Sequence, residues 1–174
     1  MNAKEVYLKA IALGIEVPCD IPDAEIERVY NGVGPEWMAG WMRKCLDFFF
    51  EVFLPAVWKH DYRYAYGDGT LKDFMDANRE LGENCRICAD AKYGWYNPLR
   101  YAAHWVGDKF AKVCDISGLP AYLQAIEETK QHNNSKKQGG EKWNTATEHQ
   151  RLVRGKARER AQSLLSMLLM NPEA

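Results

Sequence analysis

The sequence lacks the features that mark membrane-spanning, secreted and strongly charged proteins. Its longest apolar stretch, residues 48–58, is broken by Glu51 and Pro55 and is too short to cross a bilayer as a helix. The first seven residues mix charges of both signs and lead into no long apolar segment, unlike a secretion signal. The formal net charge of −1 provides no overall field that would attract nucleic acid. We therefore expect a cytoplasmic protein without a nucleic-acid partner, and export by a non-classical route stays open.

Cysteine is sparse, and its odd number argues against a disulfide-bonded scaffold. The chain has five cysteines, which we expect to be reduced thiols. Cys85 and Cys88 have the C-x-x-C spacing of metal and redox sites, but the sequence has no second pair to complete a zinc site. We expect them to be packing residues on one face of a helix.

No segment stands out as alternating apolar and polar residues like a half-buried strand, so the pattern predicts an all-α fold. Helix starts are predicted at the capping residues Asp20, Thr70 and Asn97. The expected helices cover about residues 3–13, 20–30, 35–53, 55–66, 71–90, 98–115, 120–130 and 145–170.

The composition changes after residue 130. Residues 131–144 are polar and contain two adjacent glycines, which is typical of a linker. The helix expected at 145–170 has leucines on one side and a basic middle. Such a face usually packs or joins copies of a chain, and the alternative is that its basic middle binds nucleic acid or another partner. The predicted division is a helical domain at 1–130, a linker at 131–144 and a C-terminal basic amphipathic helix at 145–170 that would support a homo-oligomer.

The helix expected at 55–66 carries polar groups on one face. Val57, His60, Asp61 and Tyr64 follow the i, i+3, i+4, i+7 spacing that puts side chains together. Burying three polar groups is costly unless each has a partner. Either this face is solvated, or it performs a function; the apolar sequence that precedes it favours a function.

The next helix has one polar residue, Asn78, on its otherwise apolar face. Because the loop 67–69 between the two helices is short, we expect an antiparallel hairpin in which His60 meets Asn78. Upstream, Tyr30, Gly32 and Gly34 form a glycine-punctuated loop. Calcium takes carboxylate and backbone carbonyl oxygens, so this loop together with an aspartate predicts a calcium site.

These segments resemble the phospholipase A2 superfamily. His60, Asp61 and Tyr64 are similar to its H-D-x-x-Y motif, and the loop from Tyr30 to Gly34 is similar to its Y-x-G-x-G calcium loop. Residues 77–84 resemble the second catalytic helix of bacterial and phage-type members. The resemblance covers about residues 28–90.

The resemblance implies a calcium-dependent hydrolase of the sn-2 ester of phospholipids, of phage or prophage origin, that works on a phospholipid or membrane surface. His60 would be the general base. Asp61 and the carbonyls of Tyr30, Gly32 and Gly34 would hold Ca²⁺. Tyr64 would hydrogen-bond the group that orients His60.

One departure concerns activity directly. Asn78 stands where the family has an aspartate, and an amide orients an imidazole without supplying a charge. Asp76 would be the counterpart if the register were shifted by two. We expect either an enzyme of reduced activity with Asn78 in the catalytic set, or a non-catalytic structural or interaction module that keeps the fold.

Overall fold

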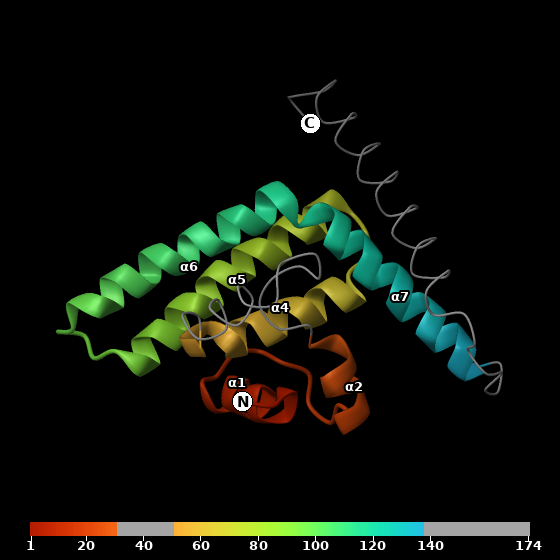
Figure 1. The fold of residues 1–174 in the computed structure, drawn as a ribbon, viewed down its shortest axis with the longest axis horizontal. Coiled ribbons are helices and arrows are strands. Elements are labelled where there is room, and N and C mark those ends of the chain that lie inside the picture. The colour runs from red at the N-terminus through yellow and green to blue at the C-terminus, as the bar shows by residue number, and fades with distance from the viewer. Residues whose placement is uncertain (31–50, 138–174) are drawn as a thin grey trace, which may run out of the picture.

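The computed structural model describes residues 1–30 and 51–137, and within them it contains six α-helices, one short 3-10 helix and no strand (Figure 1). The all-α prediction is therefore confirmed for the described part of the chain. The elements are α1 (Ala3–Ala12), α2 (Asp23–Val29), η1 (Glu51–Phe53), α4 (Leu54–Tyr66), α5 (Leu71–Lys92), α6 (Pro98–Ser117) and α7 (Leu119–Lys137). The helices expected at 35–53 and 145–170 lie, apart from 51–53, outside the described residues.

Two of the three predicted caps are present. The Thr70 hydroxyl accepts a hydrogen bond from the Asp73 amide at 3.1 Å and starts α5. The Asn97 side chain accepts from the Leu99 amide at 3.0 Å and starts α6. Each cap satisfies an amide that a helix leaves unpaired in its first turn.

The cap predicted at Asp20 is wrong. Asp20 has a φ of +61° and lies ahead of the helix, which begins at Asp23 with Pro22 in the N-cap position. Pro22 has an extended ψ of 141° and makes no side-chain hydrogen bond to the helix. The fixed φ of proline prepares the chain for the first turn, so α2 starts there without a polar cap.

Helix α7 covers the first seven residues of the segment 131–144 that is predicted as a linker. Helix α7 continues to Lys137, past the expected end at residue 130. The Gln131 side chain donates to Glu127 at 3.0 Å, and the Ser135 hydroxyl donates to the Gln131 carbonyl at 3.0 Å. Residues 131–137 contain no proline or glycine, so a polar composition alone does not end the helix. Residues 138–144 lie outside the described residues.

Helix α4 is the centre of the described fold. Helices α1 and α2 pack on one side of α4, α5 lies antiparallel to α4, and α7 packs near its C-terminal end (Figure 1). Trp58 is fully buried between α1, α2 and α4, and its indole donates to the Ile26 carbonyl at 3.3 Å. Burial of a side chain of this size contributes about 3 kcal/mol to folding.

Helices α5 and α6 run side by side at very close range (Figure 1). A Cβ atom placed on Gly107 would lie 2.7 Å from Cys85 Cβ, so only glycine permits this approach. Cys85 and Cys88 are both buried and unpaired, as the prediction of packing cysteines requires. Burial raises the pKa of the Cys88 thiol to about 11, so it stays protonated at neutral pH.

Candidate functional site

His60, Tyr64 and Asn78 meet between α4 and α5. The Nε2 atom of His60 lies 2.8 Å from Asn78 Oδ1, and the Tyr64 hydroxyl donates to the same oxygen at 2.8 Å. All three side chains are buried, and Asn78 has no exposed surface. The hairpin places His60 against Asn78, as the spacing of the two helix faces predicts.

A third helix completes this network. The Asn78 amide nitrogen donates to Asp115 Oδ1 at 2.9 Å, and Asp115 lies near the end of α6. A carboxylate only accepts, so this bond fixes the orientation of the amide. Asn78 Oδ1 therefore faces His60 and Tyr64, and His60 must carry its proton on Nε2. Its Nδ1 atom then holds the lone pair.

Burial keeps His60 neutral. Loss of solvent lowers the pKa of the imidazole to about 4, and the hydrogen bond that His60 donates to Asn78 only partly opposes this effect. An amide gives no opposite charge, so nothing adjacent favours the imidazolium strongly. His60 is therefore ready to accept a proton at neutral pH, but it is a weaker base than an ordinary histidine.

Tyr64 is held on both sides. Its ring lies 4.0 Å from the His60 ring between centroids, and burial raises the pKa of its hydroxyl far above the usual value. A Cβ on Gly118 would lie 2.5 Å from the Tyr64 oxygen, so this glycine makes room for the hydroxyl where α6 meets α7. Tyr64 thus acts as a fixed donor to Asn78 rather than as an acid.

Asp115 is the site residue that the sequence did not indicate. It lies 37 positions from Asn78, and no motif connects the two. Asp115 and Asp61 both raise the pKa of the Cys114 thiol, although burial is the larger cause, and that pKa reaches about 12. The same two carboxylates raise the pKa of Tyr64. Negative charge from α4 and α6 therefore gathers beside the site.

Asp76 does not stand behind His60. It pairs with Lys72 at 2.6 Å and with Arg79 at 3.1 Å on the outer side of α5. The register shifted by two residues, which would have made Asp76 the partner of His60, is therefore not the one observed. The hairpin is instead held by ion pairs on a neighbouring face, where Arg63 contacts Asp73 at 2.7 Å.

The predicted calcium site is described only in part. Asp61 is half-buried on α4, and Tyr30 follows α2 with an extended ψ of 103°. Gly32 and Gly34 lie outside the described residues. Within residues 1–30 and 51–137, no three histidine, cysteine or acidic side chains are grouped to hold a metal ion. The site therefore stays a prediction that depends on backbone carbonyls.

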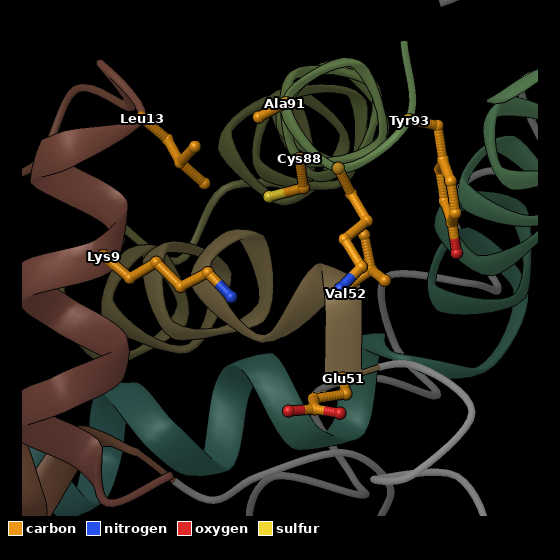
Figure 2. Close-up of a pocket in the computed structure, with 8 residues that line it drawn as sticks. Lys9, Leu13, Glu51, Val52, Cys88, Ala91 and Tyr93 are labelled. Atoms are coloured by element: carbon orange, nitrogen blue, oxygen red, sulfur yellow. The ribbon is translucent and has the colours of Figure 1, made fainter. Parts of the chain in front are cut away.

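A separate surface pocket of about 350 Å³ lies between α1, η1 and α5, away from His60. Figure 2 shows the Lys9 side chain reaching across it from α1, with the Glu51 carboxylate below. Its lining residues are Lys9, Leu13, Glu51, Val52, Cys88, Ala91, Lys92 and Tyr93. The pocket thus contains two ammonium groups and one carboxylate.

Comparisons with protein-family models, curated proteins and solved structures found no match to this chain. Among the helices that the structure describes, none is both long and apolar enough to cross a membrane.

Proposed function

We propose that the protein is a calcium-dependent phospholipase A2-like hydrolase of the sn-2 ester of phospholipids, with an activity reduced by Asn78. The observation that supports this most directly is the shared oxygen of Asn78. It accepts from His60 Nε2 and from Tyr64, each at 2.8 Å, in a buried setting. This is the arrangement that the H-D-x-x-Y resemblance implies, with an amide in place of the carboxylate.

The chemistry assigned to the residues follows from the hydrogen bonds. His60 Nδ1 takes a proton from water as the water oxygen attacks the ester carbonyl. In the resulting imidazolium, the Nε2 proton stays on the ring and continues to donate to Asn78 Oδ1. Collapse of the tetrahedral intermediate breaks the bond to the glycerol oxygen, and His60 returns the proton to that leaving group. Asn78 and Tyr64 hold the ring in place throughout.

Asp115 supplies the charge that Asn78 lacks. The carboxylate accepts from the Asn78 amide at 2.9 Å, so a negative charge stands one hydrogen bond beyond the imidazole. An amide between two charged groups transmits part of this field by polarisation. The stabilisation is weaker than that of an adjacent carboxylate, which is why we expect a slow enzyme.

Asp61 and the carbonyls of Tyr30, Gly32 and Gly34 would hold Ca²⁺, which would supply positive charge for the substrate phosphate and the developing oxyanion. The donor chemistry fits a hard cation, because Asp61 and Asp115 together make this side of Cys114 negative. Both the base and the metal ligand come from one helix, α4, in adjacent positions.

A second candidate is a non-catalytic module, and one observation favours it. Asn78 Oδ1 has two donors and its amide nitrogen has an acceptor, so the buried group is well satisfied without any substrate. Such networks also serve to specify one packing arrangement. This candidate expects no ester hydrolysis under any calcium concentration.

The deciding experiment measures release of fatty acid from a phospholipid, with calcium and with a chelator. Hydrolysis that needs calcium and disappears in His60→Gln supports the enzyme. His104→Gln is the matched control, because His104 on α6 pairs with Asp90 on α5, outside the site. Hydrolysis by the parent that His60→Gln leaves intact, or no hydrolysis by the parent at all, contradicts it.

A further inference from the structure

The turn between α5 and α6 exposes an unusual group of aromatic side chains. Trp95 and Tyr96 in the turn are 78% and 77% exposed. Tyr101 and Trp105 on the first turns of α6 are 64% and 63% exposed, and Leu99 is 57% exposed. We call these five residues the aromatic end. A soluble chain normally hides such large apolar surfaces unless something binds them.

The kind of side chain that is exposed indicates which class of partner binds here. Tryptophan and tyrosine have an apolar ring and one polar group, and both concentrate at the boundary between lipid headgroups and acyl chains. Trp95 and Tyr96 stand edge to face, 5.9 Å apart between centroids. They occupy the loop that joins α5 to α6, which is a convex end of the described fold (Figure 1).

The charges around the aromatic end are positive on balance, although the whole chain has a net charge of −1. Asp90 is paired with Arg100, and Asp108 with Arg86 at 2.9 Å. Lys92, Lys109 and Lys112 form no ion pair within the described residues.

One of these lysines lies close to an aromatic ring. The Lys109 ammonium lies 5.6 Å from the centre of the Trp105 ring. Lys92 immediately precedes Tyr93 and lines the pocket of Figure 2 with Lys9. Cations therefore border the aromatic end along α6 and at the end of α5.

We propose that the aromatic end binds the surface of an anionic membrane. Trp95, Tyr96 and Trp105 enter the headgroup region, while the lysines contact lipid phosphates and carboxylates. A convex end can enter a headgroup layer, whereas a stable pairing of two copies needs about 800 Å² of matching surface on each. The inference does not depend on ester hydrolysis, because His60 and Asn78 lie in the middle of the α4–α5 hairpin.

The test is co-sedimentation of the full chain with vesicles in the presence of a chelator. One set of vesicles contains phosphatidylcholine alone, and the other also contains phosphatidylserine. We expect binding to the second set that weakens in high salt, because the lysines act through screened charge. For Trp95→Ala/Trp105→Ala, the lipid concentration at half-maximal binding should rise by roughly tenfold or more. The reason is that two large rings are no longer transferred from water into the membrane.

Two further variants separate charge from apolar insertion. Lys92→Gln/Lys109→Gln/Lys112→Gln should lose the preference for phosphatidylserine. The matched control, Met75→Ala/Ile116→Ala, removes two exposed apolar side chains that lie outside the aromatic end, and it should bind like the parent. The chelator removes calcium throughout, so a failure of calcium-dependent hydrolysis does not affect this test.

Three results would overturn the proposal. Absence of the parent from the pellet with both vesicle sets excludes a membrane surface. Equal binding by the parent and the double tryptophan variant excludes the aromatic end as the contact. The third result is that the parent binds no lipid but associates with itself, and that the double tryptophan variant no longer does so. This result would assign the surface to a second copy of the chain. Circular dichroism of each variant confirms that these exposed substitutions leave the fold intact.

Discussion

At the residue scale, Asn78 connects a buried imidazole to an exposed carboxylate. Its oxygen faces His60 and Tyr64, and its amide nitrogen faces Asp115. A carboxylate at position 78 would place a negative charge beside His60, but it would remove the N–H group that donates to Asp115. The two requirements can be separated by exchanging the groups between positions 78 and 115.

The single variant Asn78→Asp should raise the His60 pKa well above 4 and increase calcium-dependent hydrolysis, because the imidazolium gains an adjacent counter-charge. It should also destabilise the fold by about 2 kcal/mol, since two carboxylates then face each other without a donor. In Asn78→Asp/Asp115→Asn the donor is restored, so stability should recover while the raised pKa remains. Titration of the His60 ring by NMR and urea unfolding measure the two effects, and an unchanged pKa in both variants contradicts the assigned geometry.

A second prediction concerns acid. The folded pKa of His60, about 4, is below its unfolded value of about 6.5, so between these pH values the unfolded chain binds more protons. Stability should therefore fall as the pH drops from about 6.5 to about 4, by about 3 kcal/mol from this group. Urea unfolding across this range should show a flatter dependence in His60→Gln than in the parent. His104→Gln, which removes a partly buried partner of Asp90, should leave the His60 contribution unchanged.

At the element scale, the packing of α5 on α6 depends on which glycine lies at the contact. Gly107 faces Cys85 at a distance that excludes a methyl group, whereas a Cβ on Gly82 would meet Ala111 Cβ at 3.4 Å. The two positions are on opposite helices of one interface and carry the same residue. They differ in the room available.

Gly107→Ala should therefore destabilise the protein by about 1–3 kcal/mol, because the helices must move apart. Gly82→Ala should be neutral or stabilising by up to about 1 kcal/mol, because alanine favours the helix and its methyl group meets ordinary contact distances. Thermal unfolding of the two variants beside the parent checks the contrast. Equal effects of the two substitutions on stability would contradict this prediction, because they would show that the α5–α6 interface accommodates a methyl group at Gly107.

The elements also show how far the sequence could be interpreted. The caps at Thr70 and Asn97 and the pairing of His60 with Asn78 were predictable, because local hydrogen bonds and helix spacing depend on neighbours in the sequence. Asp115 was not, because its contact with Asn78 arises from the packing of α6 on α5. The end of α7 was missed for another reason. A polar stretch without proline or glycine is compatible with a helix as well as with a linker.

At the scale of the whole molecule, one polar cluster joins segments far apart in the sequence. Arg28 on α2 contacts Glu25 at 2.5 Å and Thr129 on α7 at 3.2 Å. The Tyr66 hydroxyl at the end of α4 donates to the same Glu25 carboxylate. Arg28 lowers the pKa of Glu25, mainly through their hydrogen bond. The cluster thus connects α2, α4 and α7.

Arg28→Met should cost about 2–3 kcal/mol, because it leaves the mostly buried Glu25 carboxylate without its cation. The double variant Arg28→Met/Glu25→Gln should recover part of this loss, since no unpaired charge remains. Urea unfolding of the two single variants and the double variant gives the coupling energy directly. A coupling near zero would mean that solvent screens the pair and that the connection to α7 adds nothing.

The fixed tautomer of His60 has a consequence for observing the protein without a substrate. The proton on Nε2 is buried against Asn78, so its exchange with water must await local opening of the α4–α5 hairpin. This single ring hydrogen is a natural reporter: its NMR signal persists while α4, α5 and α6 remain closed around it and disappears when they open. The lifetime of that signal would therefore measure the rate of local opening around His60.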